Sequence, residues 1–213
     1  MDKKYLIETT KRMRVGGTGP KRNKLKFFQK MGEVPAEVLE ELNKILDDRS
    51  DNDIGGDVYG ISQAINYRKV FDTNGYRQIL IQTKPPGKIG VDVDEYLYDH
   101  WTKEVKAKKF LENYFKAVYR FRMSEMGHQH SLNWHIDSCT SYMCRAQICL
   151  NENDSVFEFK GRDGVHSFTM KPGELWFINT GWNHRVVSGD QSRRVAIFGF
   201  HFDDVKNKDL LLL

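Results

Sequence analysis

The part of the chain after Val118 alternates short apolar runs with turns, and this pattern constrains the fold more than any other feature. The runs are rich in Val, Ile, Phe, Tyr and Trp, and Gly161-Arg162-Asp163-Gly164 is typical of the turns between them. Short strands at such close spacing are typical of a closed sandwich or barrel, so we predict a mainly β jelly-roll core. The expected strands cover residues 119–126, 142–150, 156–159, 166–170, 174–178, 184–187 and 194–202.

The region before this core carries mainly helical signals. Residues 35–48 predict a helix, because Pro35 suits a first helical position and apolar residues then recur at intervals of three and four. A short strand is predicted at 78–82 and one or two helices at 94–118. A chain of 213 residues fits a single domain. We expect a basic arm at 1–33, a helical and mixed support region at 34–118 packed outside the barrel, and the β core at 119–204.

The charge of the chain is mildly positive, at +4, and the excess of Lys and Arg lies mainly in the first thirty residues. No base-stacking pattern accompanies this arm, so we interpret it as a solvated or partly ordered terminus and do not favour a nucleic-acid partner. No apolar run approaches the roughly 20 residues that cross a bilayer, and the N-terminus lacks the apolar segment of a signal peptide. We expect a cytoplasmic protein with reduced thiols at Cys139, Cys144 and Cys149, whose spacing is not that of a zinc finger.

A candidate metal site lies in Trp134-His135-Ile136-Asp137. Side chains two apart in an extended strand point to the same face, so His135 and Asp137 are expected to converge. His184 opens a later predicted strand and can complete the set. Two imidazoles and one carboxylate on one face of a metal are the ligands of mononuclear non-haem Fe(II) oxygenases.

Arginines on two of the predicted strands suggest an acidic ligand for the same cavity. Arg194 is expected to begin the last strand, and Arg145 and Gln147 share one face of an earlier strand. A guanidinium binds a carboxylate through two parallel hydrogen bonds, and an arginine inside a small barrel is costly unless it is paired. Arg193 is expected to face the opposite side of the strand, toward solvent.

These pieces occur in an order that resembles a known family. An H-x-D motif is followed by an arginine-led strand, a Met-x-x-Gly-Glu-x-Trp turn, a histidine and an arginine. Over residues 121–202 the chain is similar to the aspartyl/asparaginyl β-hydroxylase family of Fe(II)/2-oxoglutarate-dependent oxygenases. The matching residues are His135-Ile136-Asp137, Arg145 to Leu150, Met170 to Trp176, His184 and Arg194.

The resemblance implies a double-stranded β-helix, with Fe(II) held by His135, Asp137 and His184. It also implies that Arg194 binds the distal carboxylate of 2-oxoglutarate with Ser124, and that Arg145 lies on the co-substrate side of the pocket. Two departures stand out. Asp137 is present where the animal aspartyl/asparaginyl hydroxylases lack the metal carboxylate, and Gln147 replaces the family's second histidine.

We therefore expect an Fe(II)/2-oxoglutarate-dependent dioxygenase that uses O2 and releases CO2 and succinate. Its substrate is expected to be of amino-acid type: a free amino acid such as proline, or an Asp, Asn or Pro residue in a peptide. Two alternatives stay open: a non-catalytic metal-binding barrel that acts as a binding or regulatory module, and a metal-dependent cupin isomerase or epimerase. The sequence indicates neither the substrate nor the oligomeric state. Asn133 and Asn183 are candidates to orient the neighbouring imidazoles.

Overall fold

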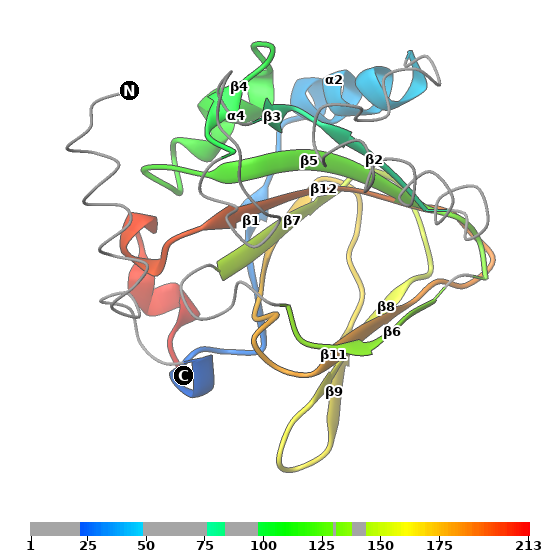
Figure 1. The fold of residues 1–213 in the computed structure, drawn as a ribbon, viewed down its shortest axis with the longest axis vertical. Coiled ribbons are helices and arrows are strands. Elements are labelled where there is room, and N and C mark those ends of the chain that lie inside the picture. The colour runs from blue at the N-terminus through cyan, green and yellow to red at the C-terminus, as the bar shows by residue number, and fades with distance from the viewer. Residues whose placement is uncertain (1–21, 49–75, 84–97, 130, 138–143) are drawn as a thin grey trace, which may run out of the picture.

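Two antiparallel sheets face each other across a flattened barrel (Figure 1). The computed structural model describes residues 22–48, 76–83, 98–129, 131–137 and 144–213. The larger sheet has the strand order β1-β10-β7-β12-β5-β2 and the smaller one β6-β11-β8-β9. The bounds in the larger sheet are β1 Phe28–Glu33, β10 Glu174–Ile178, β7 Cys144–Cys149, β12 Arg193–Phe200, β5 Tyr119–Met126 and β2 Tyr76–Leu80. Those in the smaller sheet are β6 Ser131–His135, β11 His184–Val187, β8 Val156–Lys160 and β9 Val165–Phe168.

The chain alternates between the two sheets from β5 to β8 and again from β9 to β12, which is the winding of a double-stranded β-helix. The predicted fold class is therefore confirmed. The expected strands at 119–126, 174–178 and 184–187 match β5, β10 and β11 at both ends. The last strand begins at Arg193 rather than at residue 194.

The outer face of the larger sheet is apolar and is covered by two helices, α2 (Ala36–Asp47) and α4 (Lys106–Leu111) (Figure 1). Val38, Leu42 and Leu46 form the buried stripe of α2, as the sequence predicts, and Pro35 precedes its first turn. A main cluster joins these residues to the sheet through Phe121, Met123, Ala146, Ile148, Phe177, Phe198 and Phe200. Burying such side chains stabilises the fold by about 1.5–3 kcal/mol each.

The inner faces enclose a second, smaller apolar cluster and a polar region. Phe28, Phe157, Phe159, Phe168 and Trp176 belong to the cluster, and the rings of Phe28 and Phe168 stack at 4.3 Å. Directly opposite residues of antiparallel strands share a face. The register therefore places Arg145, Gln147 and Cys149 of β7 inside the barrel, because their neighbours Ala146 and Ile148 belong to the outer cluster.

Residues at the N-terminal side contribute more structure than the sequence indicates. The segment Phe28–Glu33, which the sequence assigns to a basic arm, pairs with β10 as the edge strand of the larger sheet. The strand is not evident from the sequence because Lys30, which pairs with Glu174 at 2.8 Å, interrupts its apolar pattern. Of the helices expected at 94–118, the structure describes α4, while residues 94–97 lie outside the described residues.

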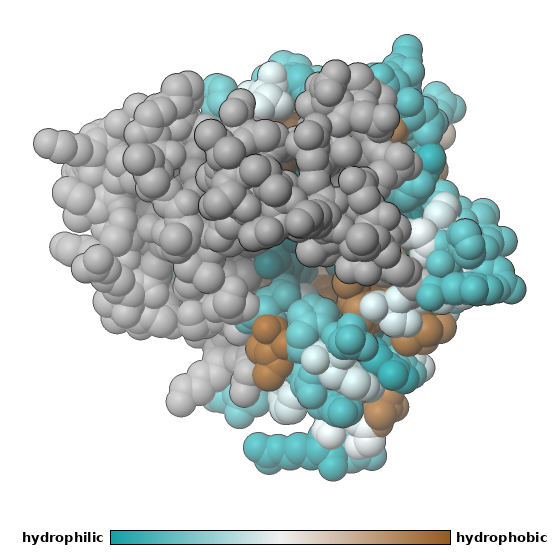
Figure 2. Space-filling model, turned by 45° about the vertical axis from the view of Figure 1, so that its right-hand side comes forward, coloured by the Kyte–Doolittle hydropathy of each residue, from teal (hydrophilic) through white to brown (hydrophobic). Residues whose placement is uncertain are grey.

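Few large hydrophobic residues are exposed among those that the structure describes. In the coloured part of Figure 2, hydrophobic residues form small separate groups among hydrophilic ones. Ile136, Val165 and Leu213 are the large hydrophobic residues exposed in the described part of the chain. In the same part, no helix has both the length and the apolar character needed to cross a membrane.

Candidate metal centre

His135, Asp137 and His184 lie together at one end of the barrel. One ligand atom from each residue lies within 4.8 Å of the other two, and the imidazole centroids of the histidines are 4.3 Å apart. Nε2 of His135 is 3.7 Å from Oδ1 of Asp137. His184 is buried, whereas His135 is exposed. The structure thus brings together the three residues that the sequence proposes as ligands.

A β-bulge turns His135 toward the cavity. His184 pairs with His135, but Val186 pairs with Leu132, so β6 has one residue more than β11 between these two pairs. The extra residue lets both Leu132 and His135 face inward, which regular alternation over three positions would not allow. Trp134 lies under two cations, with Lys160 Nζ 4.4 Å from its ring centroid and Arg185 Cζ 4.8 Å away.

Backbone carbonyls fix the orientation of both imidazoles. Nδ1 of His135 lies 2.6 Å from the carbonyl oxygen of Asn133, and Nδ1 of His184 lies 2.9 Å from that of Trp182. A carbonyl oxygen only accepts, so each Nδ1 must carry the proton and each Nε2 has its lone pair available for a metal. Asn133 therefore acts through its backbone, and Trp182 takes the role that the sequence suggested for Asn183.

Asp137 is held by Arg145. Nε of Arg145 donates a hydrogen bond to Oδ2 of Asp137 at 2.8 Å. Burial acts to raise the pKa of Asp137, but the charge of Arg145 and its hydrogen bond to the carboxylate outweigh burial, so the pKa lies below the usual value. The carboxylate is thus ionised at neutral pH, as a metal ligand must be.

His184 is kept neutral by its surroundings. Burial lowers the pKa of His184 below the usual value, and the electrostatic effects of His135 and Arg145 act in the same direction. Two imidazoles and one carboxylate form a donor set that suits Fe(II) with other coordination positions left for ligands. The residues present therefore fit the ion that the sequence implies.

The arginine at the start of β12 that faces the cavity is Arg193. Its side chain is 4% exposed, it donates a hydrogen bond to Gln147 Oε1, and its Cζ lies 4.8 Å over the ring of Phe157. The expectation that Arg193 is solvated is wrong. Arg194 points to the other side, where Nη1 pairs with Asp47 of α2 at 2.8 Å and Nε lies 3.7 Å from Glu125. Arg193 and Arg194 therefore lie on the opposite faces of β12 from those that the sequence predicts.

Ser124 and Arg122 of β5 share the inner face with these residues. Ser124 pairs with Val195, and Arg122 with Ile197, which in turn pairs with Gln147. Ser124 is 1% exposed, and its hydroxyl makes no hydrogen bond within the described part of the chain. Arg122 is also buried and was not proposed from the sequence. Its position two residues before Ser124 in the same strand was a usable signal, because the two side chains must share a face.

The Met170 to Trp176 motif has a structural role. Glu174 accepts hydrogen bonds from the backbone of Lys171 and from Trp176 Nε1, both at 2.9 Å, and pairs with Lys30 of β1. Gly173 has φ +82°, a backbone conformation that favours glycine. The motif thus closes the turn into β10 and fastens the edge strand β1.

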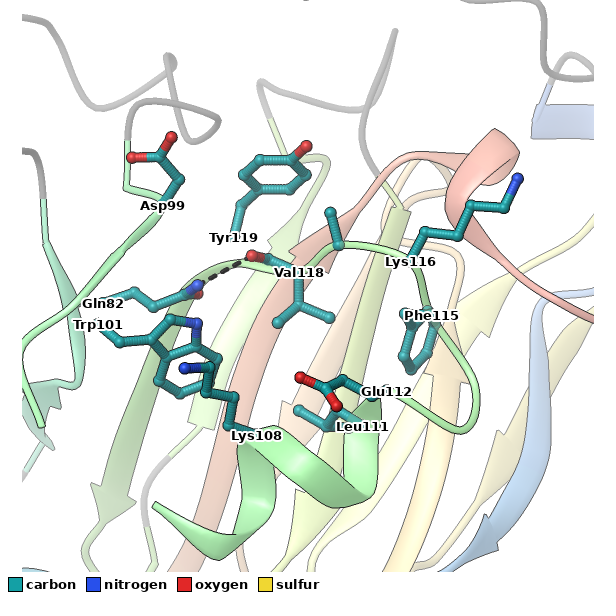
Figure 3. Close-up of a pocket in the computed structure, with 11 residues that line it drawn as sticks. Gln82, Asp99, Trp101, Lys108, Leu111, Glu112, Phe115, Lys116, Val118 and Tyr119 are labelled. Carbon is teal, nitrogen blue, oxygen red and sulfur yellow. Dashed lines mark hydrogen bonds between the residues drawn. The ribbon is translucent and has the colours of Figure 1, made fainter. Parts of the chain in front are cut away.

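A separate cavity of about 330 Å³ lies beside α4 (Figure 3). It is lined by α4, the start of β5, β3 (Gln82–Thr83) and β4 (His100–Trp101), and none of the three ligand candidates lines it. Its buried polar residue, Gln82, donates to the carbonyl of Val118 at 2.9 Å and accepts from the backbone N–H of Phe121 at 2.8 Å. Gln82 is thus engaged in holding the start of β5.

Two solved structures are similar to this chain at low sequence identity. A prolyl-4-hydroxylase from Pseudomonas putida is similar with a TM-score of 0.50 and 18% identity, covering 82% of this chain and 92% of that one. An oxidoreductase of the 2OG-Fe(II) oxygenase family from Burkholderia pseudomallei has a TM-score of 0.45 and 14% identity, covering 83% and 86%. No family model matches the sequence, and no curated protein does. At this identity, the likeness to the prolyl-4-hydroxylase shows a shared fold.

Proposed function

We propose that this protein is an Fe(II)/2-oxoglutarate-dependent oxygenase. The observation that carries the proposal is the cluster of His135, Asp137 and His184 in a double-stranded β-helix, with a buried arginine, Arg193, in the same interior. When bound together, ferrous iron, 2-oxoglutarate and dioxygen supply oxidative decarboxylation to succinate and CO2, coupled to hydroxylation of a substrate C–H bond. The fold shared with a prolyl-4-hydroxylase is compatible with this chemistry.

Three residues of this chain would bind the iron, and a fourth would position one of these ligands. His135 and His184 would bind iron through Nε2, since each Nδ1 is tied to a carbonyl oxygen. Asp137 would bind through Oδ1, since Oδ2 accepts from Arg145. Arg145 is thus a positioning residue in this proposal, in place of the co-substrate role that the resemblance implies.

Arg193 would bind the distal carboxylate of 2-oxoglutarate, in place of Arg194. Its planar guanidinium can donate two parallel hydrogen bonds to a carboxylate, and its position against Phe157 in the interior excludes water and strengthens the pairing. Gln147 already accepts from Arg193 and would orient it. The buried hydroxyl of Ser124 would supply a further donor for the same carboxylate.

The substrate that we propose is an amino acid, free or within a peptide. This part rests on the family resemblance of residues 121–202 and on the shared fold, and the known activity of the similar prolyl-4-hydroxylase makes proline the first candidate. A non-catalytic metal-binding barrel would need the three ligands but offers no reason to bury Arg193 and the Ser124 hydroxyl together.

A mass-spectrometric screen tests this function. The protein is incubated with Fe(II), 2-oxoglutarate and O2, and with amino acids and short peptides in turn. We expect a substrate that gains one oxygen atom while succinate is released in equal amount. The His184→Ala variant should release none. Equal succinate release by that variant, or no release by the wild-type protein with any compound, would contradict the proposal.

A further inference from the structure

We infer that the substrate is an extended peptide that pairs with the free edge of β6, beside the metal centre. This inference rests on the proposed oxygenase function and narrows its substrate from an amino acid, free or within a peptide, to a residue within a peptide. The peptide would add one strand to the smaller sheet, a mode of recognition in which backbone hydrogen bonds supply the affinity.

β6 lies at one edge of the smaller sheet. Within the described part of the chain it pairs with β11 and with no other strand. An edge strand presents a row of unpaired N–H and C=O groups, and proteins often protect such edges with charged residues, proline or bulges. β6 has a bulge but contains no Lys, Arg, Asp, Glu or Pro, whereas β1, at an edge of the larger sheet, contains Lys30 and Glu33. The composition of β6 therefore does little to prevent pairing with another chain.

The register shows which residues direct their backbone groups to this edge. The N–H of Lys160 donates to the carbonyl oxygen of Asn183 at 2.9 Å, so the backbone groups of Asn183 face β8. Successive residues of a strand form hydrogen bonds on alternate sides, so His184 directs its N–H and C=O toward β6. His135, which is its partner, directs its own groups toward β11.

Trp134 and Ile136 flank His135 and therefore direct their backbone groups to the free edge. This agrees with the next residue, Asp137, whose N–H donates at 3.1 Å to the carbonyl oxygen of Thr180 in the turn before β11. A peptide strand beside β6 would thus pair with Trp134 and Ile136, the two residues next to a candidate metal ligand.

The metal centre is open to solvent on this side. The side chain of His135 is 41% exposed, whereas His184 is buried. Ile136, which lies between the ligand candidates His135 and Asp137, is 49% exposed. A site for a small molecule encloses most of its ligand, so a free amino acid bound here would lack a wall on the side of β6. A peptide paired with β6 would form that wall and would cover Ile136 with one of its own side chains.

The peptide residue opposite His135 would be the one that is hydroxylated. On the free edge this pair is not hydrogen-bonded, because His135 directs its backbone groups toward β11, and the side chains of such pairs lie close together. The two Cβ atoms would be about 5 Å apart on the same face of the sheet. The target side chain would therefore enter the cavity beside the proposed iron. Its N–H would point away from β6, so proline fits at this position without the loss of a hydrogen bond.

Peptide binding without turnover tests this docking mode. Protein loaded with Mn(II) and saturating 2-oxoglutarate is titrated anaerobically with libraries of capped heptapeptides that have Pro, Asn or Asp at the centre, and with free L-proline, L-asparagine and L-aspartate. The peptide that binds most tightly is then made in two N-methylated forms. One is methylated at the two residues next to the centre, whose N–H groups would face β6. The other is methylated at the next residues outward, whose N–H groups would face away.

A proline variant changes the protein side of the same contact. Ile136→Pro removes an N–H group that is directed to the free edge of β6. A residue that precedes a proline is confined to extended conformations, and His135 already has one as part of β6. The variant is therefore compatible with the backbone of the metal centre.

Ser167→Pro is the matched control on β9, at the other edge of the same sheet. Lys160 faces β11, so Phe159 faces β9 and its partner His166 faces β8. Ser167 therefore directs its N–H to the free edge of β9, three strands away from β6.

We expect the best heptapeptide to bind at least tenfold more tightly than the free amino acid at its centre. Methylation next to the centre should raise its Kd at least tenfold, and methylation farther out should raise it less than threefold. Ile136→Pro should weaken peptide binding at least tenfold with Mn(II) binding retained, and Ser167→Pro should change neither. If Ile136→Pro loses Mn(II) or does not fold, the two methylated peptides decide the matter on the wild-type protein.

A free amino acid that binds as tightly as the peptides, equal effects of the two methylation patterns, or no binding by any peptide would overturn the docking site. Unchanged peptide binding to Ile136→Pro would do so as well. A dimer, seen by analytical ultracentrifugation, that excludes the peptides and dissociates in Ile136→Pro would assign the edge to a second copy of this chain instead. A wild-type protein that binds neither Mn(II) nor 2-oxoglutarate would overturn the proposed function itself.

Discussion

Arg145 holds one oxygen of Asp137 and leaves the other toward the histidines. Its Nε donates to Oδ2 at 2.8 Å, while Oδ1 lies 3.7 Å from Nε2 of His135. The carboxylate therefore presents a single oxygen to the proposed iron, and its rotation is restricted. Partners that orient a metal ligand in this way are part of the site as much as the ligand itself.

Arg145→Met should weaken metal binding by about 10–100-fold, the usual effect of removing such a partner. Asp137 would lose both the hydrogen bond and the nearby charge that fix it. The Kd of Mn(II), measured by electron paramagnetic resonance, reports this change directly. The Kd of Arg145→Lys should lie between those of the wild-type protein and Arg145→Met, because lysine keeps the charge but not the geometry of the guanidinium. An unchanged Kd for Arg145→Met would show that Asp137 does not depend on this contact.

Arg193 and Arg194 should differ sharply when each is changed to Met. We expect Arg193→Met to raise the Kd of 2-oxoglutarate at least a hundredfold, because a buried charge-assisted pair is lost. Arg194→Met should change it less than twofold, since its partners Asp47 and Glu125 are on the outside of the sheet. Titration of the Mn(II)-loaded variants with 2-oxoglutarate measures both values. The reverse order of effects would restore the assignment made from the sequence.

Glu174 should make the protein sensitive to acid. Burial acts to raise the pKa of Glu174, but hydrogen bonds from Lys171, Lys30 and Trp176 outweigh it and place the pKa below the ordinary 4.5. The stabilisation is thus present above pH 4.5 and is lost as the pH falls through the lowered pKa. Glu174→Gln should cost about 1–2 kcal/mol of unfolding free energy at pH 7, with a smaller loss on acidification than in the wild-type protein.

Denaturant unfolding between pH 7 and pH 3 measures this difference. Glu40→Gln is the matched control, because Glu40 is an exposed residue of α2. If the two variants show the same pH dependence, the contacts of Glu174 do not carry the acid sensitivity.

The sequence predicts the β core well because its strands follow regular physical signals. β10 is a largely apolar run that follows Pro172-Gly173, and β11 lies between two polar turns; the predicted bounds of both strands match at each end. α2 shows an apolar stripe at helical spacing, and Pro35 precedes it. Such local patterns survive in the folded protein because tertiary packing agrees with them.

Other features depend on contacts that local patterns do not contain. β1 is a half-buried edge strand that contains Lys30, so its sequence resembles a basic arm. Its place in the sheet depends on contacts with distant residues, such as the pairing of Lys30 with Glu174. Which of Arg193 and Arg194 faces inward depends on strand register, since a shift of one residue exchanges the two faces. The bulge before His135 likewise follows from pairing with β11 and not from the residues of β6 alone.

The most direct measurement is an anaerobic titration of the protein with Fe(II) and 2-oxoglutarate, followed by visible absorption. We predict a weak charge-transfer band that saturates at one iron and one 2-oxoglutarate per chain. It should be absent in His184→Ala and should need far more 2-oxoglutarate in Arg193→Met. No band from the wild-type protein at millimolar 2-oxoglutarate, or an undiminished band from His184→Ala, would contradict a site in which these side chains hold iron and its co-substrate.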